Sequence, residues 1–245
     1  MHPYLLHSGH LLLPTFGVLA AVGLMAALTL SLRTAAIVGL VPDKLWNAGL
    51  FTLLSAFALS RLLLIAANLH DFFAYPILLL MVPSLTAGGI VLTVIATAIY
   101  LRTRNLPLLD TLDAWSPCAT LIWAFLALGH FAEGTDAGLP STLPWAIAIP
   151  PSSIRLHPVA LYAALAAAIL TLGLLRALQR RHRPGDTFAL ALATSGTAQF
   201  LLTFLRQPLP DSNFLDPIQW IAVGMIALAG LVLLLQPRKL VTHAV

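Results

Sequence analysis

Long apolar stretches separated by short polar segments dominate this sequence. A transmembrane helix needs about 20 consecutive, mostly apolar residues, and the chain holds seven stretches that approach or exceed this length. They are Leu11–Leu32, Trp46–Ala67, Tyr75–Leu101, Pro117–Gly129, His157–Gln179, Thr187–Leu205 and Pro217–Gln236. We expect the short fourth stretch to be tilted, or to be extended at its start by Leu112–Ser116. The pattern predicts an all-α integral membrane protein with seven transmembrane helices, in which residues 1–245 form a single domain.

The composition points in the same direction. Hydrophobic residues make up 59% of the chain and charged residues only 9%, whereas soluble proteins carry about 25% charged residues. So few charged residues cannot cover a surface exposed to water. The single cysteine, Cys118, excludes an internal disulfide and a cysteine-based metal cluster. We expect neither a metal ion nor a cofactor.

The basic residues lie mainly on one side of the predicted spans. Those that follow the first, third, fifth and seventh spans are Arg33, Lys44, Arg102, Arg104, Arg176, Arg180, Arg181, Arg183, Arg238 and Lys239. Cytoplasmic loops collect Lys and Arg, so we expect the N-terminus outside the cell and the C-terminus in the cytoplasm. The loop of residues 130–156 is then outside. The net charge of +4 reflects this topology, not an affinity for nucleic acid.

Ionisable residues in or beside the spans are candidates for function, because lipid makes them costly. His130 follows the fourth span, Arg155 and His157 lie at the start of the fifth, Arg206 ends the sixth, and Arg61 lies within the second. All but Arg61 are predicted at the outer face of the membrane. The planar guanidinium group of Arg suits phosphate, and His exchanges a proton near neutral pH. Together they predict a site for a phospholipid head group with acid–base capacity.

Each of these residues also has an interpretation without a substrate. His130 can cap a helix end at the membrane interface, and Arg206 can extend its guanidinium group to the lipid head groups. His157 precedes Pro158, which suits the first turn of a helix. Arg61 can pair with a backbone carbonyl group inside the bundle. The residues alone leave both interpretations open.

The order of the polar motifs resembles that of the prolipoprotein diacylglyceryl transferase family of bacterial inner membranes. LALGHFAEGTDAG falls where the family has GRxGNFxNGExxG, and it keeps Gly129, Phe131, Gly134 and Gly138. Three further stretches resemble the family motifs RHPSQLYE, FRQP and SFHGG. These are IRLHPVALYAA at Ile154–Ala164, LRQP at Leu205–Pro208 and SLTAGG at Ser84–Gly89. The resemblance covers most of the chain and implies a fold with seven spans.

Several polar residues of the family motifs are replaced in this chain. The residues at those positions are Phe16, Ala87, Ala127, His130, Glu133, Thr135 and Gln199. The resemblance implies transfer of diacylglyceryl from phosphatidylglycerol to the cysteine thiol of a lipoprotein precursor with a lipobox, with release of glycerol phosphate. A thiol with a pKa near 8.5 requires a base, and the departing phosphate requires positive charge or hydrogen-bond donors. The substitutions predict a rearranged catalytic set.

We expect His130, Arg206 and His157 to be catalytic. His130 is the candidate base, oriented by Glu133 three residues later if that segment is helical, while Arg206 binds phosphate and His157 is a second donor. The residues that we expect to bind lipid are Arg61, Gly88, Gly89, Gly134, Arg155, Tyr162 and Gln199. A catalytically inactive relative that binds phospholipid or lipoprotein precursors is the alternative. A small-solute transporter is less well supported, because the sequence has no inverted repeat.

Overall fold

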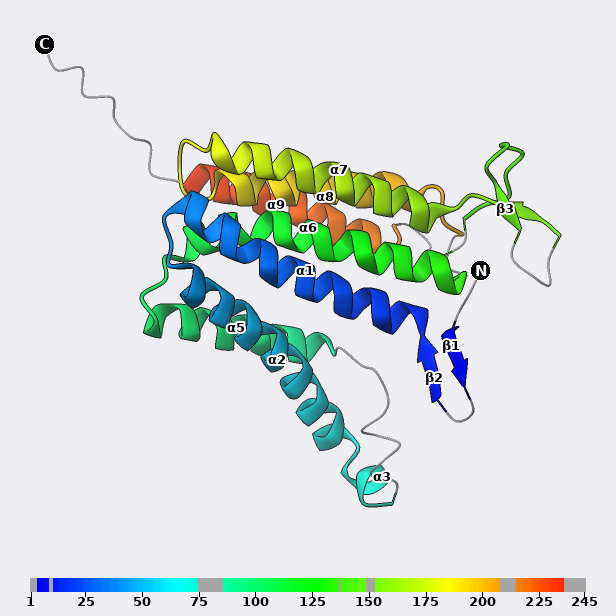
Figure 1. Ribbon diagram of the computed structural model, residues 1–245, viewed down its shortest axis with the longest axis horizontal. Helices are drawn as coiled ribbons and strands as arrows, with labels where there is room; N and C mark the ends of the chain where they lie inside the picture. Colours follow the sequence, from blue (N-terminus) through cyan, green and yellow to red (C-terminus); the bar gives the residue numbers. More distant parts are fainter. Residues whose placement is uncertain are drawn as a thin grey trace, which may run out of the picture. The chain divides into compact units, whose positions relative to one another are not determined.

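The computed structural model describes residues 4–8, 11–74, 86–136, 138–148, 153–207 and 215–235. Helices make up most of this part of the chain (Figure 1). The chain divides into two compact units, Met1–Leu30 with Leu112–Val245 (unit 1) and Ser31–Thr111 (unit 2). The boundary falls inside helix α1 (Thr15–Val38) and near the start of helix α6 (Leu108–Glu133).

Unit 1 is a helical bundle. Helices α6, α7 (Val159–Gln179), α8 (Asp186–Thr203) and α9 (Pro217–Leu235) lie side by side (Figure 1). A cluster of buried residues from the end of α6, the start of α7 and the end of α8 comprises Ala127, Val159, Ala163, Ala164 and Leu202. Small residues let the helices approach closely, as is common where lipid supplies no hydrophobic force between helices.

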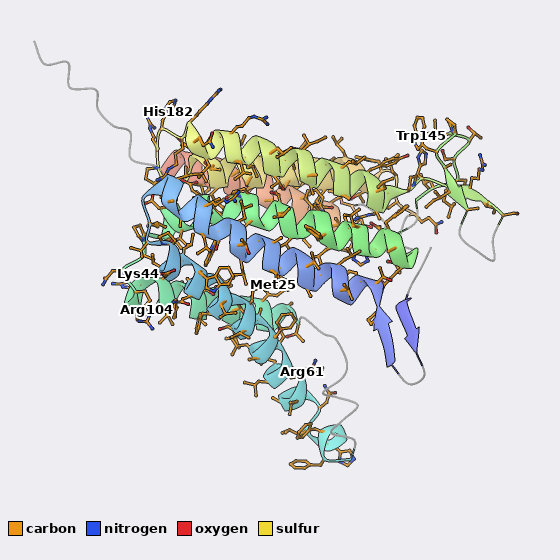
Figure 2. The ribbon with its side chains drawn as sticks, viewed as in Figure 1. Met25, Lys44, Arg61, Arg104, Trp145 and His182 are labelled. Carbon is orange, nitrogen blue, oxygen red and sulfur yellow. The ribbon has the colours of Figure 1, made fainter. Side chains whose placement is uncertain are left out.

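The two ends of unit 1 differ in structure. Strands β3 (Ile147–Ala148) and β4 (Arg155–Leu156) form a short antiparallel pair beyond the start of α7. Figure 2 shows Trp145 beside this pair and His182 at the opposite end, between α7 and α8. We refer to them as the Arg206 end and the Asp113 end of unit 1, after the charged residues described below.

Unit 2 contains α2 (Pro42–Ala67), α3 (Leu69–Ala74) and α5 (Ala87–Thr103). Proline at the start of α2 has the backbone angle that a first helical turn requires. Helix α5 is capped by Thr86, whose hydroxyl accepts a hydrogen bond of 3.1 Å from the Gly89 amide. The two long helices pack directly, since a Cβ atom at Gly89 would lie 2.6 Å from Ser60 Cα.

Five of the described helices are long and apolar enough to cross a membrane, namely α1, α2, α6, α7 and α9. The chain is therefore a multi-pass membrane protein. The predicted extension of the fourth span through Leu112–Ser116 is confirmed, because α6 is continuous from Leu108 to Glu133. The first 11 residues of the predicted span Tyr75–Leu101 lie outside the described residues.

The start of the first span is a correction. We predicted a helix from Leu11, but Leu11–Pro14 form strand β2, which pairs with β1 (Tyr4–Ser8), and α1 begins only at Thr15. The leucines before Pro14 form a short apolar run whose pattern does not separate strand from helix. Proline then disfavours the helical conformation for the residue before it.

Candidate active site

Three stretches that the sequence marked as motifs meet at the Arg206 end of unit 1. The Gly138 amide donates to the His157 carbonyl group at 3.0 Å, and the His157 amide donates to the Leu139 carbonyl group at 3.0 Å. The Leu139 amide donates to the Leu205 carbonyl group at 2.9 Å, next to a bridge between Gly138 and Arg206. The segment after α6 thus lies between the start of α7 and the end of α8.

Glycine is required at the centre of this arrangement. A Cβ atom at Gly138 would lie 2.6 Å from the Leu205 carbonyl oxygen and 2.8 Å from His157 Cβ. Upstream, Gly134 has φ +75° and Asp136 has φ +61°. Both are left-handed conformations, which aspartate tolerates better than most residues. This turn reverses the chain after α6 and brings Asp136 to Arg206.

Asp136 and Arg206 form an ion pair. Arg206 Nε lies 2.8 Å from Oδ1 of Asp136, and Nη2 donates to Oδ2 at 2.9 Å. The Arg206 side chain is 18% exposed and the Asp136 side chain is 23% exposed. From the sequence, Asp136 belongs to one cluster with His130 and Glu133, but a solvated loop face is the favoured interpretation. The signal for a specific role is an acidic residue between two glycines of a motif, a position compatible with a tight turn.

A cavity of about 370 Å³ adjoins this pair. Its polar lining residues include His130, Asp136, Gln199 and Arg206. The apolar part comes from α6, α7 and α9 and includes Trp123, Ala127, Ala163, Ile218, Ile221 and Met225. An apolar cavity with a few polar groups at one end is the usual form of a small-molecule site.

A second cavity of about 400 Å³ shares Trp123, Gln199 and Met225 with the first. Its other lining residues follow one face of α6 and one face of α8, and include Leu112, Ser116, Thr120, Phe188, Ala191 and Ser195. The Ser116 hydroxyl donates to the Leu112 carbonyl group at 2.7 Å and the Thr120 hydroxyl to that of Pro117 at 3.1 Å. Both hydroxyl groups donate to carbonyl groups of α6 and so offer no proton to a ligand in the cavity. The second cavity is largely apolar.

His130 is held by Thr135. Its Nδ1 atom lies 2.9 Å from Thr135 Oγ1, and that hydroxyl lies 3.3 Å from the His130 carbonyl oxygen. When the hydroxyl proton is donated to this carbonyl group, Oγ1 accepts Nδ1–H and leaves Nε2 free to accept a proton. We expected Glu133 to orient His130 if the segment is helical, and the helix does extend through Glu133. The hydrogen bond to the ring comes instead from Thr135, which the turn at Gly134 brings back to the histidine.

Two predicted residues of unit 1, His157 and Tyr162, form a second group together with Trp145. Trp145 Nε1 donates to Tyr162 Oη at 2.7 Å, and His157 Nδ1 lies 3.5 Å from the same oxygen. Arg155 is exposed on β4, where its carbonyl group accepts from the Ser141 amide at 2.9 Å. None of these four residues is among the residues lining the two cavities described above. The His157 ring therefore lies beside Tyr162 and does not line these two cavities, although its backbone contacts Gly138 and Leu139.

Three predicted residues belong to unit 2. Gly89 is buried where α5 packs on Ser60, whereas Gly88 is exposed. Arg61 is half-buried on α2 (Figure 2). Gly89 therefore has a packing role that accounts for its lack of a side chain.

Comparisons with known proteins point to one family. A model of the prolipoprotein diacylglyceryl transferase family matches residues 3–235. The phosphatidylglycerol–prolipoprotein diacylglyceryl transferase of Clostridium tetani is 25% identical over 234 residues, which cover 92% of this chain and 94% of that protein.

Two proteins of the same name match over shorter lengths. The protein from Finegoldia magna is 28% identical over 62% of this chain and 60% of its own length. The one from Cereibacter sphaeroides is 33% identical over 53% of this chain and 47% of its own length. The family model covers nearly all of the chain. The chain belongs to the prolipoprotein diacylglyceryl transferase family.

Proposed function

We propose that this protein transfers diacylglyceryl from phosphatidylglycerol to the cysteine thiol of a lipoprotein precursor that carries a lipobox. The observation that carries the proposal is the cavity that holds His130, Asp136 and Arg206 and is mostly lined by apolar residues. The names of the relatives supply the two substrates, phosphatidylglycerol and prolipoprotein. The family resemblance supports the bacterial inner membrane as the location.

We further propose that residues 1–245 form one membrane domain with seven spans. The asymmetry of Lys and Arg supports an N-terminus outside the cell and a C-terminus in the cytoplasm. In that orientation the Arg206 end, with the loop of residues 130–156, faces outward. It is the side on which a secreted precursor presents its cysteine.

In this proposal the lipid head group binds at His130 and Arg206, and an acyl chain follows α6 and α8. Between Leu112 and His130, the face of α6 that lines the two cavities rises by about 27 Å, at 1.5 Å per residue. The hydrocarbon core of a bilayer is about 30 Å thick. An acyl chain that spans one leaflet is therefore no longer than this mostly apolar lining.

The proposed chemistry is a displacement at carbon. The thiol proton passes to His130 Nε2, and the thiolate sulfur attacks the glycerol carbon that carries the phosphate. A carbon–sulfur bond forms, the carbon–oxygen bond breaks, and its electron pair leaves with the oxygen of glycerol phosphate. Arg206 stabilises the charge that develops on the phosphate. Thr135 positions the His130 ring.

The other predicted residues take secondary roles in this proposal. His157 is a second donor, and Arg155 and Tyr162 lie beside it on the segment that faces the incoming precursor. Gln199 lines both cavities and would contact the acyl chain near the head group. Gly134 shapes the turn. Arg61, Gly88 and Gly89 remain predicted lipid contacts.

The test uses purified protein, phosphatidylglycerol and a lipobox peptide, with mass spectrometry to detect the diacylglyceryl thioether. We expect product with the wild type and with Arg180→Ala, which removes an exposed arginine at the Asp113 end. We expect Arg206→Ala to lose the product while remaining folded. Binding of phosphatidylglycerol without any thioether, beside an active relative in the same assay, would contradict the proposal and identify a lipid-binding protein without transferase activity.

A further inference from the structure

We infer that Asp136 promotes release of the phosphate product. Its carboxylate lies 2.8 and 2.9 Å from two nitrogens of Arg206, and both residues line the first cavity. The inference rests on the proposed function, because it concerns the anion that the transfer reaction would leave at Arg206. Asp136 acts through Arg206 and is a positioning residue rather than a catalytic one.

The charge at this site increases during the proposed reaction. Phosphatidylglycerol is a phosphodiester with one negative charge. The electron pair of the broken carbon–oxygen bond stays with glycerol phosphate, a monoester whose second pKa is about 6, so that it carries nearly two negative charges at neutral pH. An unpaired arginine would attract this product more strongly than it attracts the substrate head group. Release of the product would then be slow.

The ion pair counteracts this effect. Asp136 gives the pair a formal charge of zero and occupies the Nε and Nη2 side of the guanidinium group of Arg206. A dianion therefore meets less positive potential and fewer open donors. Phosphatidylglycerol is less affected, because its acyl chains also bind the apolar cavity through the hydrophobic effect. Glycerol phosphate has no acyl chain and depends on charge alone.

The backbone supports a specific role for this carboxylate. Asp136 adopts φ +61°, a conformation that is costly for most residues other than glycine. Asparagine tolerates this conformation as well as aspartate does. Asp136→Asn therefore removes the charge while keeping the shape and the turn, and Asp136→Gly removes the side chain without backbone strain.

The experiment measures binding of three soluble molecules to the purified full-length protein by calorimetry at pH 8. Glycerol phosphate is a dianion, glycerophosphoglycerol is a monoanionic diester, and glycerophosphocholine has no net charge. For Asp136→Asn we expect about tenfold tighter binding of the dianion and about threefold tighter binding of the monoanion, because the Coulomb energy scales with charge. We expect no change for glycerophosphocholine. Glu133→Gln, which removes a charge from the preceding turn, is the control and should change each affinity less than twofold.

Unchanged or weaker binding of glycerol phosphate to Asp136→Asn would overturn the inference. So would an equal gain for all three molecules, because a change in cavity shape rather than in charge would then be responsible. If Asp136→Asn does not fold, Asp136→Gly carries the same expectations. A wild type without transferase activity would refute the proposed function, yet the calorimetric comparison would still decide the role of Asp136. In an active enzyme, we expect the inhibition constant of glycerol phosphate to fall about tenfold in Asp136→Asn.

Discussion

The two ends of unit 1 each hold an aspartate paired with an arginine, but the two pairs differ in their surroundings. Asp113 is fully buried, and its carboxylate accepts from the Gly185 amide at 2.7 Å, the Phe188 amide at 2.8 Å and Arg181 Nη1 at 2.9 Å. Asp136 is partly exposed and lies beside Arg206 at the edge of a cavity.

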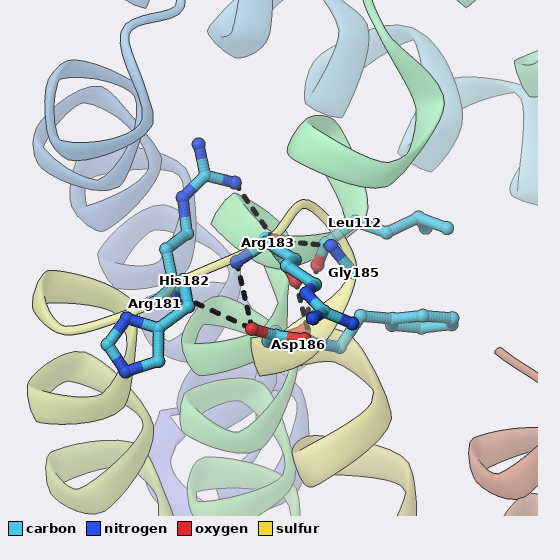
Figure 3. A network of polar contacts seen from close by, with 9 residues as sticks. Leu112, Arg181, His182, Arg183, Gly185 and Asp186 are labelled. Carbon is cyan, nitrogen blue, oxygen red and sulfur yellow. Dashed lines mark hydrogen bonds and ion pairs between the residues drawn. The ribbon is translucent and has the colours of Figure 1, made fainter. Parts of the chain in front are cut away.

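The surroundings decide what each pair can do. At the Asp113 end, both carboxylate oxygens of Asp113 accept hydrogen bonds from backbone amides and so connect α6 to the start of α8 (Figure 3). Gly185, with φ +94°, directs its amide at Asp113. At the other end, the guanidinium group of Arg206 faces a cavity large enough for a ligand. An ion pair in a membrane protein is therefore evidence of function only where it retains accessible donors or acceptors.

Removal of Asp113 should give the largest loss of stability. Asp113→Ala leaves two backbone amides and Arg181 without their acceptor, and loss of one partner of a buried pair costs about 3–5 kcal/mol. We expect a large fall in the melting temperature of the purified protein. Asp136→Asn is the matched substitution at the partly exposed pair, where we expect less than about 1 kcal/mol. Equal losses for the two variants would remove the distinction between the pairs.

Removal of Arg206 should give the largest loss of activity relative to its effect on stability. Loss of one donor that stabilises developing negative charge lowers turnover by about 10²–10³-fold. We expect this decrease for Arg206→Ala in the thioether assay, with a smaller one for Arg206→Lys, which keeps the charge but not the planar fork. A variant that loses activity only in proportion to its folded fraction would assign Arg206 a structural role.

Gly138→Ala should disturb the point where the three motifs meet. The new Cβ atom would press on the Leu205 carbonyl oxygen, and overpacking of this kind costs about 1–3 kcal/mol. We expect a lower melting temperature together with slower transfer. Gly173→Ala is the control, because a Cβ atom on this exposed position of α7 meets nothing within 4 Å. That change should be neutral or stabilise the helix by up to about 1 kcal/mol.

Much of this arrangement can be read from one sequence. Apolar length predicts where most of the helices lie, and the order of the motifs predicts which segments carry the site. The pairing of Asp136 with Arg206 is not readable, because it joins residues 70 positions apart through a turn whose direction depends on two left-handed residues. Asp113 was missed despite an available signal, since an acidic residue beside an apolar stretch is costly without a partner.

The identity of the residue beside His130 was also beyond the sequence. Glu133 lies in α6 three residues after His130, as the helix expectation required, yet the hydrogen bond to the ring comes from another residue. The turn that follows the helix brings the hydroxyl of Thr135 to Nδ1 of His130. Helix ends are set by local turn geometry and are uncertain by a residue or two in any reading of a sequence.

Thr135→Val gives the smallest of these effects. Valine keeps the shape of threonine but cannot hydrogen-bond His130 Nδ1, so both neutral forms of the ring become populated and Nε2 is less often free to accept a proton. We expect transfer to slow by about tenfold, less than the 10²–10⁴-fold that loss of a general base costs. Thr135→Ser, which keeps the hydroxyl, should restore most of the rate.

A double-mutant cycle separates this role from packing. If Thr135 acts only by positioning the histidine, Thr135→Val should slow the residual transfer of a His130→Ala protein no further, because the two residues share one interaction. If the losses instead multiply, the hydroxyl acts on something other than His130. Thr135 occupies the position at which the family motif has glutamate. If the effect of Thr135→Val depends strictly on His130, then His130 and Thr135, both substitutions relative to the motif, form a base and its positioning partner.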